Sequence, residues 1–261
     1  MGARQSSGIL SRVLAREARG RPRNAAGRRP EWRYRLLRML KPRRLYLDGF
    51  DLIAWRSTMP KHIAALLARG DYEGPERRAL VGLLRPGDRV LEIGGCIGLL
   101  SLIAARIVGP ENVLVYEPNP QAADTARRNF DANGMPIRLV ERAVDAVAGT
   151  ATLSVGHQSW LGASMYQNIG EREIAVTVER IGDIVAKERP TALVLDAEGA
   201  EVSILTHCPL RELRLIVLEL HPDLIGEAGV VVIRHTLTAA GFMRIGAFCE
   251  AETEAWLRDC S

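Results

Sequence analysis

The chain alternates short apolar runs with segments of helical pattern, and this alternation restricts the folds open to it. RVLEI (89–93), ALVLD (192–196) and LRLIVLEL (213–220) are apolar over most of their length, as strands buried on both faces are. Because helical segments separate these runs, the sequence predicts an α/β fold: a mostly parallel sheet with helices on both faces. The expected strands are 89–93, 112–116, 137–141, 192–196, 213–220 and 242–248, with 149–155 and 174–180 as exposed or edge strands; the expected helices are 98–109, 120–133, 199–207 and 223–241.

Charge divides the chain into two unequal parts. Residues 1–44 carry 14 Lys/Arg and 2 acidic residues, whereas the remainder carries 21 and 29. The basic segment is either a solvated tail, poorly ordered to about residue 29, or an anchor for an anionic surface. Within it, EWRYRLLRML (31–40) mixes basic and apolar residues as a surface helix does. We therefore predict a basic extension (1–44), a hairpin and helix added to the domain (45–87), and the main domain (88–261).

The four cysteines include no CxxC pair, and no apolar run reaches the roughly 20 residues that a membrane span needs. A disulfide framework and a zinc site are therefore disfavoured. Free thiols fit a reducing compartment. We expect a cytoplasmic protein, with peripheral contact to the inner membrane surface as an open alternative.

The first buried strand runs into a glycine turn that selects the ligand. The turn reads Glu92-x-Gly94-x-x-x-Gly98. No lysine follows Gly98, which excludes a P-loop, and Cys96 interrupts the GxGxxG pattern of dinucleotide sites. An acid at the strand end would repel a pyrophosphate but suits the ammonium and sulfonium of S-adenosylmethionine (SAM). The sequence therefore predicts SAM as cofactor, with Glu92, Gly94 and Gly98 at its site.

The second buried strand also ends in an acid. Glu117 follows VLVY and precedes Pro118, 25 residues after Glu92. A carboxylate in this position accepts the ribose hydroxyls in dinucleotide folds. We assign the same role to Glu117.

Acidic residues and a histidine follow the next two strands. LVLDAEGAE brings Asp196, Glu198 and Glu201 close together, and VLELHP adds Glu219 and His221. Carboxylates and a histidine can act as general bases, and we name Asp196, Glu198 and His221 as catalytic candidates, in that order. A divalent metal held by Asp196 and Glu198 is an alternative, although no ligand spacing requires it, and we predict no metal.

The region from about Tyr72 to Phe242 resembles the FkbM family of SAM-dependent methyltransferases. The resemblance rests on DYEGPE, RPGDRVLEIGGCIGLLSL, VYEPNP, AVDAVAGTATL, LVLDAEGAE and VLELHP. It implies a Rossmann-like class I methyltransferase fold with a seven-stranded sheet, and O-methylation of sugars or secondary metabolites. It also implies that Asp145 or its neighbour Val144 lies by the adenine, and that Tyr72 and Glu73 lie near the methionine end. The family's turn usually reads D-x-G-A-N-x-G, so Glu92, Gly95 and Cys96 depart from it.

We expect in-line methyl transfer from SAM to a hydroxyl of a sugar, glycan or secondary metabolite. SWLGASMY (159–166) is a candidate wall of the acceptor site. One alternative is a nucleic-acid methyltransferase guided by the basic extension; DAEGAE at the fourth strand's end, in place of [DN]PP[YFW], makes nucleic acid an unlikely partner. The other is a non-catalytic protein that keeps the SAM fold.

Overall fold

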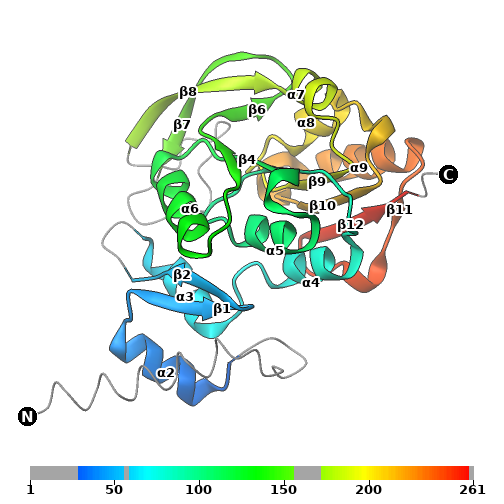
Figure 1. The fold of residues 1–261 in the computed structure, drawn as a ribbon. Helices are drawn as coiled ribbons and strands as arrows, with labels where there is room; N and C mark the ends of the chain where they lie inside the picture. Colours follow the sequence, from blue (N-terminus) through cyan, green and yellow to red (C-terminus); the bar gives the residue numbers. More distant parts are fainter. Residues whose placement is uncertain (1–28, 56–58, 156–171, 259–261) are drawn as a thin grey trace, which may run out of the picture.

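The computed structural model describes residues 29–55, 59–155 and 172–258 (Figure 1). The predictions for residues 1–28 and for the candidate acceptor wall at 159–166 lie outside these residues and stay predictions. No helix in the described ranges is long and apolar enough to cross a bilayer.

A seven-stranded sheet forms the centre of the molecule, with the strand order β5-β4-β3-β9-β10-β12-β11. All neighbouring pairs from β5 to β10 are parallel, whereas β12 runs antiparallel to both β10 and β11. This order, with one reversed strand near an edge, is that of the class I methyltransferase fold. The strands are β3 (Val90–Ile93), β4 (Val113–Tyr116), β5 (Arg138–Val140), β9 (Ala192–Leu195), β10 (Leu215–Glu219), β11 (Met243–Arg244) and β12 (Thr253–Leu257).

Helices cover both faces of this sheet (Figure 1). Successive strand residues point to opposite faces, so Val90 belongs to one apolar cluster and Leu91 to the other. Both clusters are buried, which explains why the strands lack polar alternation. One face carries α4 (Gly74–Leu83), α5 (Leu99–Val108) and α6 (Pro120–Ala132); the other carries α7 (Ile181–Glu188), α8 (Glu201–His207) and α9 (Pro222–Ala239).

A second, three-stranded sheet lies beside the first, with the order β6-β8-β7. It contains β6 (Ala143–Asp145), β7 (Gly149–Val155) and β8 (Arg172–Arg180). The segments 149–155 and 174–180, expected as exposed or edge strands, pair with one another here. Their inward residues form a small apolar cluster of their own.

The N-terminal elements add a further layer below the sheet in Figure 1. They are α2 (Glu31–Leu40), β1 (Arg44–Leu47), β2 (Phe50–Ile53) and α3 (Lys61–Arg69). The predicted hairpin is confirmed: β1 and β2 pair antiparallel around Asp48 and Gly49, both with positive φ. Two such residues are what a tight two-residue hairpin turn requires.

The C-terminal prediction was wrong in part. Instead of one strand over 242–248, the chain forms the two-residue β11 and a 3-10 helix at Gly246–Phe248, and β12 follows. β12 was missed because TEAWL carries an acid at a position that is buried. Glu254 is 1% exposed and forms ion pairs with Arg234 on α9 and Arg244 on β11, so both partners come from other elements.

Candidate active site

A pocket opens where β3, β4 and β9 end. Strand order reverses between β3 and β9, and ligands of open α/β sheets bind at such a switch point, beyond the carboxyl ends of the strands. Its lining comprises Ile93, Gly94, Cys96, Glu117, Pro118, Arg142, Ala143, Val144, Leu153, Asp196, Ala197, Glu198 and Ala200. Five of the residues named from the sequence are in this set: Gly94, Glu117, Val144, Asp196 and Glu198.

The glycine turn packs tightly against the end of β9. Gly94 has φ +88°, and a Cβ there would lie 1.8 Å from the carbonyl oxygen of Asp196. Gly98 has φ +79°, and its Cβ would lie 2.4 Å from the Phe130 ring on α6. Side chains are therefore excluded at both positions, and the backbone of the turn forms one side of the pocket.

Glu117, at the end of β4, holds the glycine turn through a hydrogen bond to its backbone. Its carboxylate accepts hydrogen bonds from the backbone N–H of Cys96 and of Asn119, both at 2.8 Å. Burial raises its pKa to about 7, although these two hydrogen bonds act in the opposite direction. A carboxylate has about four acceptor positions, so two remain for a ligand in the pocket.

Glu92 lies behind the turn and is not among the pocket-lining residues. It is 1% exposed and accepts a hydrogen bond of 2.6 Å from the Ser101 hydroxyl. Burial raises its pKa to about 8, and the charge of Glu117 adds to the shift. A cation bound nearby would lower both pKa values.

Tyr72 and Glu73 lie close to the same turn, where Tyr72 interacts with Cys96 and Glu73 with Glu92. The Tyr72 hydroxyl and Glu73 Oε2 are buried and form no hydrogen bond of good geometry with the described residues, although Tyr72 lies close enough to Glu73 and Cys96 to interact with both. Burial, followed by the charge of Glu92, raises the pKa of Glu73 well above its ordinary value. Two unsatisfied buried polar atoms are a costly arrangement, and a polar ligand group would relieve it.

The ring of His221 lies among the acidic residues that follow β9. Its Nδ1 lies 2.8 Å from Oε1 of Glu201, which is fully buried. Its Nε2 lies 3.3 Å from Glu198 Oε2 and 3.6 Å from Asp196 Oδ1. The structure thus brings together all three predicted catalytic residues.

The protonation of His221 follows from these contacts. Burial alone would lower its pKa, but the hydrogen bond to Glu201 and the charges of Asp196 and Glu198 raise it to about 10. His221 is therefore a cation at neutral pH in the free protein. Its charge offsets part of the repulsion among the acids around it.

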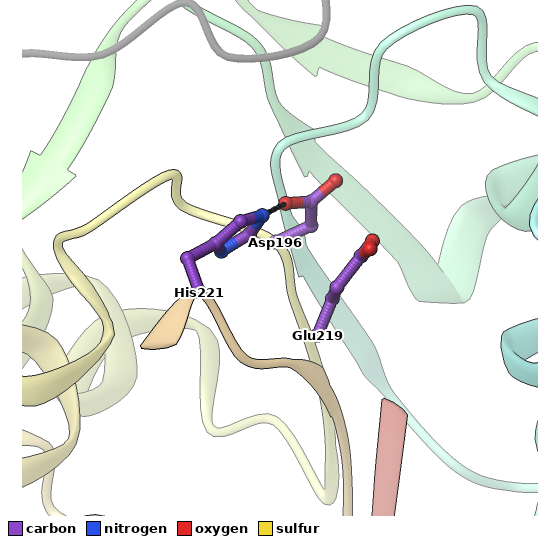
Figure 2. A group of neighbouring side chains, drawn as sticks. All are labelled: Asp196, Glu219 and His221. Carbon is purple, nitrogen blue, oxygen red and sulfur yellow. Dashed lines mark ion pairs between the residues drawn. The ribbon is translucent and has the colours of Figure 1, made fainter. Parts of the chain in front are cut away.

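Asp196, Glu219 and His221 form the group best placed to hold a metal among the described residues. One ligand atom from each lies within 4.8 Å of the others. Figure 2 shows Asp196 and His221 pointing toward each other, with Glu219 on the adjacent strand. Burial, then the charge of Glu76, raises the pKa of Glu219 to about 7. We predicted no metal and named Asp196 with Glu198 only as an alternative metal pair; the group that the structure brings together contains Asp196 but not Glu198.

The pocket's apolar wall comes from the small sheet. Val144 and Leu153 line the pocket. Asp145 is not in the lining set; its Oδ1 accepts a hydrogen bond from Ser203 at 2.5 Å. Between the two residues named for the adenine region, Val144 therefore faces the pocket.

Two charged residues of this site had no role assigned to them from the sequence. Arg142 lines the pocket and pairs with Glu179 on β8, and no local pattern marks it. Glu201 was grouped with Asp196 and Glu198 but not named as a catalytic candidate, and it bonds the ring of His221. The signal in the sequence was Gly199 between Glu198 and Glu201. In the structure it forms a turn in which Glu198 has φ +47° and the Gly199 N–H donates to the Glu201 carboxylate.

Comparisons with known proteins find local similarity to two methyltransferases. No protein-family profile matches the chain. It is 37% identical over 81 residues to a ribosomal protein L11 methyltransferase of Symbiobacterium thermophilum, covering 31% of this chain and 26% of that protein. It is 41% identical over 56 residues to the Geobacillus kaustophilus protein of the same name, covering 22% and 18%. The chain thus spans about a quarter or less of these relatives.

Solved structures give weaker likenesses. A precorrin-6y C5,15-methyltransferase of Geobacter metallireducens is 13% identical, with a TM-score of 0.44 over 77% of this chain and 92% of that one. A SAM-dependent O-methyltransferase of Thermotoga maritima is 14% identical, with a TM-score of 0.41 over 72% and 65%. Because these scores are low, the fold assignment rests on the strand order of the sheet.

Proposed function

We propose that this chain is a SAM-dependent methyltransferase of the FkbM type that methylates a hydroxyl of a sugar, glycan or secondary metabolite. The observation that carries the proposal is the pocket at the switch point, where a glycine turn and the Glu117 carboxylate face the cluster around His221. The local similarity to two methyltransferases supports the reaction class.

The residues present fit SAM. Val144 and Leu153 offer an apolar wall to the adenine, and Glu117 keeps two acceptor positions for the ribose hydroxyls. The buried, unsatisfied atoms of Tyr72 and Glu73 suit the polar methionine end. Several carboxylates with raised pKa values surround this region, so a cation is the ligand that relieves them.

SAM supplies an electrophilic methyl group when bound; the chain supplies alignment and a proton acceptor. Asp196 and Glu198 line the pocket, where either carboxylate can take the proton of the acceptor hydroxyl. Burial and the charge of Glu219 raise the pKa of Asp196 well above its ordinary value, and the charge of His221 acts in the opposite direction. Glu201 is a positioning residue, because its bond to Nδ1 directs Nε2 toward Asp196 and Glu198.

A second candidate follows from the curated relatives, whose names give ribosomal protein L11 as the substrate. Transfer to a protein group would use the same pocket. The similarity covers only part of those proteins, so the acceptor has to be found by experiment.

Transfer of labelled methyl from SAM to hydroxylated sugars, glycan extracts, ribosomal protein L11 and RNA tests the proposal. We expect label on the hydroxyl acceptors. Asp196→Asn should lower kcat by about 10² or more with little change in SAM affinity. Asp223→Asn, an exposed change at the start of α9, is the matched control. Label on protein or RNA alone would overturn the assignment of the acceptor, and no transfer to any class would favour a non-catalytic protein.

A further inference from the structure

Helix α2 has two apolar faces, and the fold uses only one. Tyr34 and Leu37 are buried in the core shared with α3 and β1. The guanidinium of Arg69, at the end of α3, lies 4.7 Å from the centroid of the Tyr34 ring. This inward face explains why the helix packs on the domain.

The helix is also held at its start. The Arg29 backbone N–H donates to the Arg69 carbonyl at 2.8 Å, and its guanidinium donates to the Ala68 carbonyl at 2.8 Å. Because α2 is fixed along its length, the direction of its outward face is fixed too.

That outward face is apolar. Trp32 is 62% exposed and Met39 is 73% exposed. They are seven residues apart, so they lie on one side of the helix, with the half-buried Leu36 between them. At 3.6 residues per turn this row lies opposite Tyr34 and Leu37.

Basic residues surround the row. Arg35, Arg38, Lys41 and Arg43 are exposed, and the one acid of the helix, the exposed Glu31, pairs with Arg35. The sequence before the helix, residues 1–28, adds seven arginines and one glutamate. An apolar row flanked by positive charge is complementary to the boundary between acyl chains and anionic headgroups of a bilayer.

We propose that α2 docks the protein on an anionic lipid surface, with Trp32 and Met39 in the headgroup–acyl boundary and the basic residues against the lipid phosphates. Nucleic acid offers phosphates but no apolar layer to take up Met39. In Figure 1, α2 lies at the end of the molecule remote from the β6–β8 sheet that lines the pocket. Docking therefore leaves the pocket accessible, and the inference does not depend on the proposed function.

Vesicle flotation of the full chain tests the charge requirement. We expect binding to vesicles of phosphatidylcholine with phosphatidylglycerol, and little to phosphatidylcholine alone. Trp32→Ser/Met39→Ser should weaken binding to the anionic vesicles by roughly tenfold or more. The control Val231→Ser/Met243→Ser changes two residues of equal exposure, 62% each, on α9 and β11, and should bind as the unchanged protein does.

Quenching by brominated acyl chains tests insertion separately from adsorption. Tryptophan fluorescence should be quenched on anionic brominated vesicles, and Trp32→Phe should remove most of that quenching while retaining binding. Trp256 is 4% exposed and serves as the internal reference.

Three results would overturn the inference. One is equal binding by both double variants, which would mean that charge alone attaches the chain. Another is quenching that persists in Trp32→Phe. The third is retention of a random-sequence duplex, but not of vesicles, which would assign the basic segment to nucleic acid.

Discussion

At the scale of single residues, the contact between Glu201 and His221 shows how a residue outside the pocket lining can act on the residues within it. Glu201 is fully buried, and it bonds both the Gly199 backbone N–H and the ring of His221. A buried carboxylate behind a histidine fixes the ring's orientation and raises its basicity. The role of Glu201 is visible only when the loop after β9 is folded beside the end of β10.

Glu201→Gln should lower the pKa of His221 from about 10 toward its ordinary value of 6.5. The amide can still accept from Nδ1, so the ring stays in place while the charge is lost. A titration of the histidine ring followed by NMR measures this. Glu227→Gln, an exposed change on α9, should leave the pKa as it is; an unchanged pKa in Glu201→Gln would show that its charge does not control His221.

Gly94 and Gly87 provide a matched pair for the turn. Both have φ near +90°, but a Cβ at Gly87 meets nothing within 4 Å, whereas one at Gly94 meets the Asp196 carbonyl. Gly87→Ala should cost about 1 kcal/mol of unfolding free energy, and Gly94→Ala about 3 kcal/mol or more. Urea denaturation compares them. Equal costs would mean that the close approach of the turn to β9 is not rigid.

At the scale of elements, the buried parallel strands could be predicted from sequence because continuous apolar runs report burial on both faces. Asn119 before Pro120 marked the start of α6, and its side chain indeed accepts from the Gln121 backbone N–H. β12 could not be predicted in this way. Its buried Glu254 is stable only beside Arg234 and Arg244, which long-range folding alone brings together.

In the candidate site, too, the sequence predicted some features and not others. Residues that directly follow a strand, such as Glu117 and Asp196, were predictable because parallel strands end at one edge of the sheet. The orientation of a side chain was not: Glu92 turns behind the loop to Ser101, and Asp145 turns to Ser203. Periodicity in the sequence predicts which face of an element a side chain lies on. It does not predict the hydrogen-bond partner, because Ser101 and Ser203 belong to other elements than Glu92 and Asp145.

At the scale of the whole molecule, the free protein carries a surplus of buried carboxylates. The pKa values of Glu92, Glu117 and Glu219 rise from 4.5 to about 8, 7 and 7. Between pH 4.5 and about 8, the native state therefore binds more protons than the unfolded state. Its free energy of unfolding consequently falls as pH rises through this range. His221 acts in the same direction: its contribution is complete below pH 6.5 and is lost as pH rises through about 10.

The unfolding free energy of the ligand-free protein should therefore decrease as pH is raised from about 5 to about 8. Glu92→Gln should flatten this slope, because the amide carries no titrating charge and can still accept from Ser101. Urea denaturation across this pH range measures both. A stability that rises with pH would mean that these carboxylates are ionised at no cost in the native state.

SAM binding tests the central claim, that the switch-point pocket holds SAM through Glu117. Calorimetry on the full chain should show micromolar SAM binding and no binding of NAD or ATP. Glu117→Ala should weaken SAM binding by roughly tenfold to a hundredfold, since it removes charge-assisted hydrogen bonds. Glu227→Ala should bind SAM as the unchanged protein does. Absence of SAM binding to the folded chain, or full affinity in Glu117→Ala, would contradict the account.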